Sequence, residues 1–385
     1  MSQAALFTTD TPSEAPGWDA LGFEIGWDHA HYRVVPPAEH LHQGHPVRQG
    51  WQAGQAVFGP RTLRPTPAVR QWLRLRLQAW LRGQAFEAMQ VTPNFLAQLA
   101  VTHCPVTGEP LTEGTGQGTD AVVERVFHGA GVAAGNLVVM SARAAAAKAN
   151  CGWDDALDFA RQIDSGALQR IGGLDAIEWS RLGVLMSLAT PLKHAQVAGL
   201  PLLVLPPNRL RVLNPVQALQ TLLTLLFTQP AYARNMADLA AVMPSTAARQ
   251  TFQVFMHTLL ARRVAAGPLA TGVALRRGME QAWLHPLVQR RWQRLALSLS
   301  VGECEHIVQY AGRRKLAGAA CQWLSRASAT DGWALESHGK LAAGAVAQAA
   351  LPLPGNAAYS ALRKVRFTRQ APSNACSPAA SGATP

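Results

Sequence analysis

The chain has 385 residues, of which 48% are hydrophobic and only 15% are charged, a balance that excludes a wholly disordered polymer. At about 100–200 residues per domain, this length predicts two or three domains and a substantial core. The net charge is +12, from 35 Lys and Arg against 23 Asp and Glu. Such a field attracts polyanions, so nucleic acid is the expected class of partner. No apolar run approaches the ~20 residues of a membrane span, and no membrane partner is expected.

The first stretch of the chain predicts little regular structure. Residues 1–20 are polar and contain prolines, and they predict a flexible N-terminus without a secretory signal. Between Leu21 and Gly59 the apolar stretches are short and are cut by prolines and glycines, which favours short strands or loops over helix. On a strand, His29 and His31 would lie on one face and could bind a metal ion. The alternative is that both are exposed loop histidines.

A basic helix is predicted over residues 67–82, within an N-terminal region that spans residues 21–102. Thr66 and Pro67 are typical of a helix start, and Gly83 is a typical stop. An apolar stripe at helical spacing fits an ordinary surface helix, and the arginines around it would alternatively lie along phosphates. The stripe is Val69, Leu73, Leu77, Trp80 and Leu81, and the arginines are Arg70, Arg74, Arg76 and Arg82.

Residues 103–150 contain a recognisable order of motifs. His103-Cys-Pro-Val-Thr-Gly-Glu-Pro-Leu is followed by a glycine-rich turn and then by Asp120-Ala-Val-Val-Glu-Arg-Val-Phe-His. A second glycine-rich stretch leads into Gly135-Asn-Leu-Val-Val-Met-Ser, and an alanine-rich run ends at Lys148. This order resembles the HNH nuclease motif, also called the ββα-metal or treble-clef nuclease fold. The resemblance implies two strands and a helix that hold one catalytic metal ion and often a zinc knuckle.

The residues at the catalytic positions of that motif depart from the family pattern. The resemblance places the Asp-His pair at Glu124-Arg125, where a guanidinium cannot act as a general base. Asn136 matches the middle Asn of the motif, and the metal ligand of the helix falls near Ala145, which offers no donor. A rebuilt nuclease would use Glu124 as metal ligand and His128 as base. An unrelated hairpin and alanine-rich helix is the other alternative.

The sequence also lacks most of the zinc ligands that the family motif contains. The resemblance places its four ligands at Cys104, Thr107, Ser141 and Ala144, and one sulfur does not hold a tetrahedral zinc ion. Cys104 is therefore a candidate ligand without partners, and no cofactor is expected. Replacement of the catalytic His by Arg125 would turn a water-activating position into a phosphate-pairing one. Arg143 and Lys148 would add positive charge on the helix.

Residues 151–365 predict a mainly helical basic domain. Leucine-rich blocks alternate with prolines there, and residues 262–315 carry ten basic residues against three acidic ones. Arg290, Arg291 and Arg294 surround Trp292, an arrangement found on surfaces that follow a nucleic-acid backbone. The alternative is a solvated helix face with a buried Trp292. Residues 366–385 predict a disordered tail.

The five cysteines are odd in number, scattered and without a C-x-x-C pair, which predicts no disulfide framework and a reducing cytoplasm. The sequence as a whole predicts a mainly α protein with a small α+β ββα-metal-like module in its N-terminal third. We interpret it as a non-catalytic nucleic-acid-binding protein, most simply a DNA-binding one. The alternatives are a helical protein-interaction scaffold and a divergent metal-dependent HNH endonuclease, so its status as an enzyme stays open.

Overall fold

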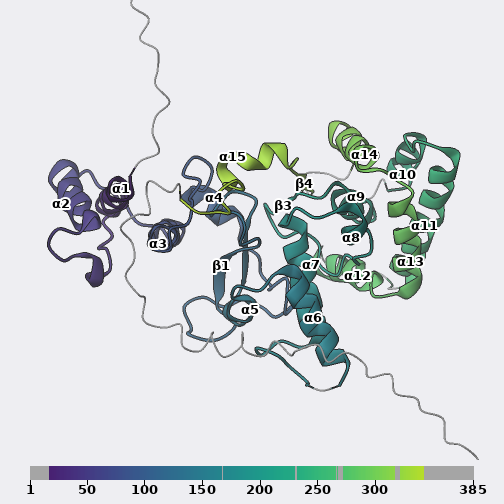
Figure 1. Cartoon of the computed structure of the whole chain (residues 1–385), viewed down its shortest axis with the longest axis horizontal. Coiled ribbons are helices and arrows are strands. Elements are labelled where there is room, and N and C mark those ends of the chain that lie inside the picture. The colour runs from purple at the N-terminus through teal and green to yellow at the C-terminus, as the bar shows by residue number, and fades with distance from the viewer. Residues whose placement is uncertain are drawn as a thin grey trace, which may run out of the picture. The chain divides into compact units, whose positions relative to one another are not determined.

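The structure is a computed structural model, and it describes residues 17–166, 168–229, 232–265, 267, 272–316 and 321–341. In this part of the chain the protein is mainly helical, as the sequence predicts, with two small two-stranded sheets (Figure 1). The predicted flexible N-terminus falls outside the described residues up to residue 16, and the predicted tail falls wholly outside them. Within the described ranges, none of the helices combines the length and the apolarity that a bilayer crossing requires.

Two helices form where the sequence predicted short strands or loops, so that prediction is wrong. Helix α1 (Trp18–His31) packs against α2 (Pro46–Phe58), and glycines let the two backbones approach closely. A Cβ atom on Gly26 would lie 1.9 Å from the Val47 carbonyl oxygen, and one on Gly50 would lie 1.8 Å from that of Phe23. The glycines that suggested turns are therefore packing positions inside helices.

Helix α3 (Pro67–Leu81) confirms the predicted basic helix. The Thr66 hydroxyl accepts a hydrogen bond from the Val69 amide at 3.2 Å and caps the N-terminus. The predicted apolar stripe is largely buried, and the Arg76 guanidinium binds Glu24, at 2.8 Å, and Asp28 on α1. Arg70 and Arg74 stay exposed to solvent.

A hairpin and a helix follow the short helix α4 (Pro93–Gln98). Strands β1 (Ala121–Arg125) and β2 (Leu137–Ser141) pair antiparallel, with Glu124 opposite Val138 and Arg125 opposite Leu137. Helix α5 (Ala142–Lys148) begins directly after β2. β2 is buried along its whole length and β1 is half-buried, and the polar residues Glu124, Arg125 and Ser141 lie at the strand ends.

The remaining elements build the main core around α9 (Pro215–Leu226), whose residues are nearly all buried. This helix contains one of the leucine-rich blocks of the predicted helical domain. Within the predicted helical domain, residues 278–297 belong to two helices, because Pro286 starts a new one after His285. The other elements are α6 (Trp153–Asp164), α7 (Ala176–Ala189), α8 (His194–Ala198), β3 (Arg211–Val212), α10 (Tyr232–Ala241), α11 (Thr246–Ala265), α12 (Gly272–Ala282), α13 (Pro286–Leu297), α14 (Val301–Arg314), β4 (Gln322–Trp323) and α15 (Thr330–Trp333).

The segment 321–341 returns to the N-terminal part of the fold. Its strand β4 pairs parallel with β3, and its buried Trp333 donates a hydrogen bond from Nε1 to the Ala134 carbonyl oxygen at 3.0 Å. The Gly131 amide donates to the Trp333 carbonyl oxygen at 2.7 Å, and the Ala85 amide donates to that of Gly339 at 3.0 Å. The returning segment therefore fixes the connection between β1 and β2 from outside the hairpin.

Candidate functional site

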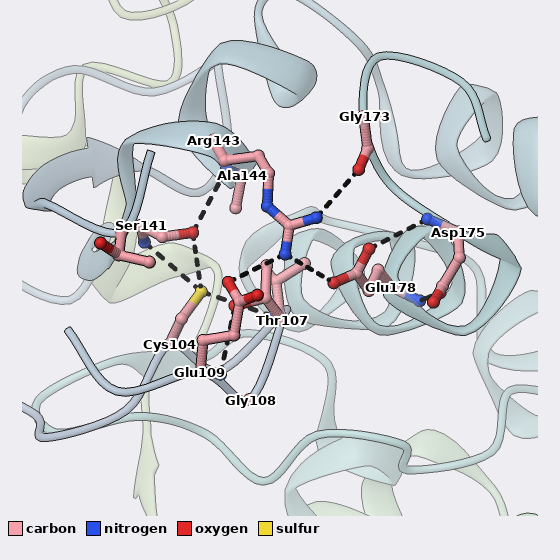
Figure 2. A network of polar contacts seen from close by, with 12 residues as sticks. Cys104, Thr107, Gly108, Glu109, Ser141, Arg143, Ala144, Gly173, Asp175 and Glu178 are labelled. Atoms are coloured by element: carbon pink, nitrogen blue, oxygen red, sulfur yellow. Dashed lines mark hydrogen bonds and ion pairs between the residues drawn. The ribbon is translucent and has the colours of Figure 1, made fainter. Parts of the chain in front are cut away.

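The four positions that the family resemblance assigns to a zinc knuckle converge in the structure. The Cys104 sulfur accepts hydrogen bonds from the Thr107 amide at 3.5 Å and from the Ser141 amide and hydroxyl at 3.4 Å each. The Ser141 hydroxyl in turn caps α5 by accepting from the Ala144 amide at 3.3 Å. Figure 2 shows these residues gathered around the sulfur. A buried thiol that accepts hydrogen bonds thus occupies the centre of the cluster.

The residues of this cluster do not fit a zinc ion. Cys104 supplies one sulfur, Ala144 supplies no donor, and the Thr107 hydroxyl already accepts from the Glu109 amide at 3.3 Å. Zinc in a structural site is held by four Cys or His ligands. Over the described residues, no group of three or more His, Cys, Asp or Glu side chains is arranged to hold a metal ion. Hydrogen bonds to a single thiol hold the cluster together.

Arg143 links the start of α5 to two other parts of the chain (Figure 2). Its guanidinium binds Glu109 at 2.9 Å and Glu178 on α7 at 3.0 Å, and it donates to the Gly173 carbonyl oxygen at 2.9 Å. Its side chain is only 24% exposed. We therefore assign Arg143 a structural role, because carboxylates and a carbonyl already take its donors.

A buried ion pair occupies the other end of the hairpin unit. Lys148, at the end of α5, is fully buried, and its Nζ lies 3.4 Å from Glu124 Oε1 and 2.6 Å from His128 Nε2. Burial lowers the pKa of Lys148 to about 8, because desolvation of the ammonium outweighs the attraction of Glu124. A fully buried ammonium has no route to a phosphate, so Lys148 does not belong to a nucleic-acid interface in this conformation. Ala145, one turn earlier, offers no polar atom.

Arg125 and Asn136 hold the loop between the two strands. The Arg125 guanidinium is mostly buried and donates to the Ala130 carbonyl oxygen at 2.8 Å. Burial lowers its pKa, although Glu124 opposes the shift. Asn136 is completely buried; its Oδ1 accepts from the Phe127 amide at 2.8 Å, and its Nδ2 donates to the carbonyl oxygens of Phe127 and Gly131 at 3.0 Å each. Both residues therefore shape the loop, and neither presents a free polar group to a substrate.

His128 is poorly suited to act as a general base. Burial, assisted by the charges of Lys148 and Arg125, lowers its pKa to about 3. A catalytic base works best with a pKa near the operating pH. A small cavity of about 100 Å³ adjoins the imidazole, with Phe127, Cys151 and Trp153 in its lining. The ring therefore stays neutral at physiological pH and accepts a hydrogen bond from the lysine.

The lowered pKa of His128 predicts an acid-sensitive fold. Unfolding returns the imidazole to a pKa near 6.5, so the unfolded chain binds more protons between about pH 3 and pH 6.5, and the free energy of unfolding falls as the pH drops through that range. We expect the slope from this residue to approach about 1.4 kcal/mol per pH unit. Urea unfolding of the wild type and of His128→Gln from pH 7.5 to pH 4 measures it, with exposed His306→Gln as the control. Parallel profiles for the wild type and His128→Gln would contradict this assignment.

The histidines predicted as a metal pair lie on α1 and not on a strand. Residues two apart on a helix point in nearly opposite directions, so His29 and His31 cannot share an ion. His29 is buried, and its Nδ1 lies 2.8 Å from the Ile25 carbonyl oxygen. His31 stacks on Phe58 of α2, with ring centroids 4.5 Å apart. The structure therefore does not bring His29 and His31 together as a pair, and over the described residues neither they nor Cys104 belong to a group that could hold a metal ion.

The arginines of α13 divide by exposure. Trp292 is buried against Phe255 and Trp283, with ring centroids at 5.4 and 5.8 Å. Arg290 and Arg294 lie one turn apart and are exposed, and Arg291 is half-buried. In the part of the chain that the structure describes, none of the three forms an ion pair.

Sequence reasoning missed the aromatic side chains on α1 and α2 because it did not predict those helices. Phe23, Trp27 and His31 recur every four residues, a spacing that places them on one helix face and that could have indicated α1. In comparisons with family models, with curated proteins and with solved structures, nothing matches this chain. The structure and its chemistry alone therefore carry the functional interpretation.

Proposed function

We propose that this chain is a non-catalytic nucleic-acid-binding protein that contains a degenerate HNH-like module in residues 103–148. The order of β1, β2 and α5, and the convergence of the four knuckle positions on Cys104, support the resemblance to the ββα-metal fold. The four described cysteines are free thiols, which supports a reducing compartment, and we place the protein in the cytoplasm.

One contrast carries the proposal. Inside the hairpin unit, the cations Arg125, Arg143 and Lys148 all bind carboxylates or carbonyl oxygens of the chain itself. On the solvent faces of α3 and α13, arginines stand at helical spacing without such partners within the described ranges: Arg70, Arg74, Arg290 and Arg294. Unpaired arginines attract phosphates and release counterions on binding. The module therefore supplies a scaffold, and the helices supply the binding surface.

The absence of catalysis follows from the same unit. The Lys148 ammonium neutralises Glu124, the carboxylate that a nuclease would use as a metal ligand, and the nearby His128 is a weak base. A cation that belongs to the chain thus occupies the place where the resemblance would put a metal ion beside this carboxylate. Cleavage of plasmid DNA that depends on Mg²⁺, Mn²⁺ or Zn²⁺ and is lost in Glu124→Ala or His128→Ala would contradict this part of the proposal.

The proposal predicts salt-sensitive binding by the α13 arginines. We expect the full chain to bind labelled duplex DNA with a dissociation constant of about 1 μM or tighter at low salt. In the double variant Arg290→Glu, Arg294→Glu the slope of log K against log salt should fall by about 1.8, because each phosphate contact contributes about 0.9. Fluorescence anisotropy over a salt series measures both quantities.

The matched control is Arg161→Glu on α6. Arg161 is 75% exposed, like the arginines of interest, but it already pairs with Asp158. We expect this variant to bind as the wild type does. Binding that is absent in the wild type, or that does not respond to salt, would overturn the proposal.

A further inference from the structure

Helices α1 and α2 carry a row of aromatic rings, of which one is exposed and three are half-buried. Trp27 contacts Phe58 with ring centroids 5.0 Å apart, and Phe58 stacks on His31 at 4.5 Å with an interplanar angle of 14°. Phe23 continues the row at 6.2 Å from Trp27 and is 37% exposed. These four residues, which we call the aromatic row, come from two helices held together by close glycine contacts. Their positions are therefore fixed by the backbone.

A pocket opens at the C-terminal ends of the two helices. It has a volume of about 340 Å³, within the range of small-molecule sites. Its lining includes Trp51 and Gln55 of α2 and Arg33, which follows α1 in a left-handed conformation with a φ of 54°. Thr62 also lines it, and its hydroxyl oxygen is buried and has no hydrogen-bond partner among the described residues. The pocket thus offers a flat ring, an amide, a guanidinium and an unused hydroxyl.

The pocket and the aromatic row approach each other along the chain at the ends of α1 and α2. Ala30 and Gly59 line the pocket, and each is the chain neighbour of a ring in the row, His31 and Phe58. The Leu63 amide donates to the His31 carbonyl oxygen at 2.8 Å, which holds the chain after α2 against the end of α1.

The charge of this surface favours a polyanion. Arg33, Arg61 and Arg64 are exposed there, and within the described ranges none of them forms an ion pair. Glu24 and Asp28, the carboxylates on α1 closest to the row in sequence, both pair with Arg76, which offsets one of their two negative charges. Rings that can stack combined with unpaired arginines are the features that bind single-stranded nucleic acid, because every base presents a flat π face.

We propose that this end of α1 and α2 binds a single-stranded nucleic acid, with bases stacked along the aromatic row and one base in the pocket. Trp51 stacks on the inserted base, and the Gln55 amide and the Thr62 hydroxyl hydrogen-bond its edge. Arg33, Arg61 and Arg64 pair with the phosphates. The inference rests on the proposed nucleic-acid function and specifies its substrate class and a binding surface separate from the arginines of α13.

The test compares single-stranded and duplex probes on the full chain. Anisotropy is measured with a labelled oligothymidylate longer than about 16 nucleotides, and with a duplex of equal length. Trp27→Ala and Phe58→Ala should each weaken single-strand binding by about 5- to 150-fold, since stacking contributes about 1–3 kcal/mol per base, and should leave duplex binding unchanged. Val57→Ala is the matched control, because Val57 adjoins Phe58 on α2, is 65% exposed and has no ring.

A further variant tests the same site at an exposed side chain, in case the aromatic variants fail to fold. Gln55→Ala changes an exposed side chain, and it should weaken binding and reduce any preference among oligo-dT, oligo-dC and oligo-dA while circular dichroism and the melting temperature stay unchanged. Single-strand binding unaffected by Trp27→Ala, Phe58→Ala and Gln55→Ala would overturn the inference. The proposed function would survive that result if Arg290→Glu, Arg294→Glu still weakens duplex binding. A dimer in sedimentation that Phe58→Ala abolishes would identify a second copy as the occupant and would also overturn the inference.

Discussion

Lys148→Met is expected to leave the free energy of unfolding unchanged or to raise it by up to about 3 kcal/mol at pH 7. The pKa of Lys148 falls from 10.5 to about 8 in the folded protein, so the fold disfavours the charged amine relative to water. Methionine keeps an unbranched stem in the same space and carries no charge. Glu124 loses its partner, but its side chain is 28% exposed and can be hydrated.

The pH dependence gives this prediction a second readout. Between about pH 8 and pH 10.5 the unfolded chain holds a proton on Lys148 that the folded chain has released, so the free energy of unfolding of the wild type rises with pH in that window. The advantage of Lys148→Met should therefore be largest below pH 8 and fade above it. Urea unfolding at several pH values measures the difference between the two proteins.

Lys148→Ala separates packing from charge. It removes the same ammonium and also the buried stem, so it should be about 2–5 kcal/mol less stable than Lys148→Met. A loss of more than about 2 kcal/mol in Lys148→Met itself would show that the ion pair with Glu124 is a net source of stability, contrary to the usual balance for buried pairs. If the expectation holds, Lys148 does not stabilise the fold, and its role is to position His128 and the loop that follows it.

Restoring three cysteines should create a zinc site at the Cys104 cluster. In the triple variant Thr107→Cys, Ser141→Cys, Ala144→Cys, thiols would replace the side chains of the three residues that are linked to the Cys104 sulfur directly or through Ser141. Zinc binds four thiolates at about 2.3 Å, and structural zinc in small domains contributes about 10–16 kcal/mol of apparent binding energy. We expect the melting temperature of the variant to rise with Zn²⁺ and to fall with a chelator.

Cobalt gives a direct measure of the geometry, because Co²⁺ in a tetrahedral thiolate site absorbs strongly in the visible range. The matched control adds Cys104→Ser to the triple variant, which removes the central ligand and should weaken binding sharply. A folded triple variant whose stability and spectrum do not respond to Zn²⁺ or Co²⁺ would show that the four positions are not a former knuckle. That result would remove the HNH resemblance, whereas binding through the exposed arginines would remain open to its own test.

The parts of the fold that the sequence predicted are those with local signals. Helix α3 follows from its cap and its apolar stripe, and the helical domain follows from its leucine-rich blocks and the prolines between them. Helices α1 and α2 were missed despite the helical spacing of Phe23, Trp27 and His31, because the glycines that permit their close contact also resemble turn signals. Close backbone packing between two segments depends on the tertiary structure, and the local sequence of either segment does not predict it.

The candidate site shows the same division. The positions of Cys104, Thr107, Ser141 and Ala144 were expected together only because of the resemblance to the HNH motif. The partners of Arg143 could not, because Glu109 and Glu178 lie more than thirty residues away on either side. The sequence does not show which group an arginine binds. Only the fold shows whether it pairs with a carboxylate of the same chain or remains available for a phosphate.

The return of residues 321–341 to the connection between β1 and β2 has a consequence for biosynthesis. The Trp333 indole and carbonyl complete hydrogen bonds with Ala134 and Gly131, which are made some two hundred positions earlier. During translation, the loop that carries His128 and Asn136 therefore lacks these contacts until nearly all of the helical domain has been synthesised. Ribosome-bound chains that stop short of residue 321 should remain protease-sensitive in this loop, and chaperone contact during synthesis should concentrate there.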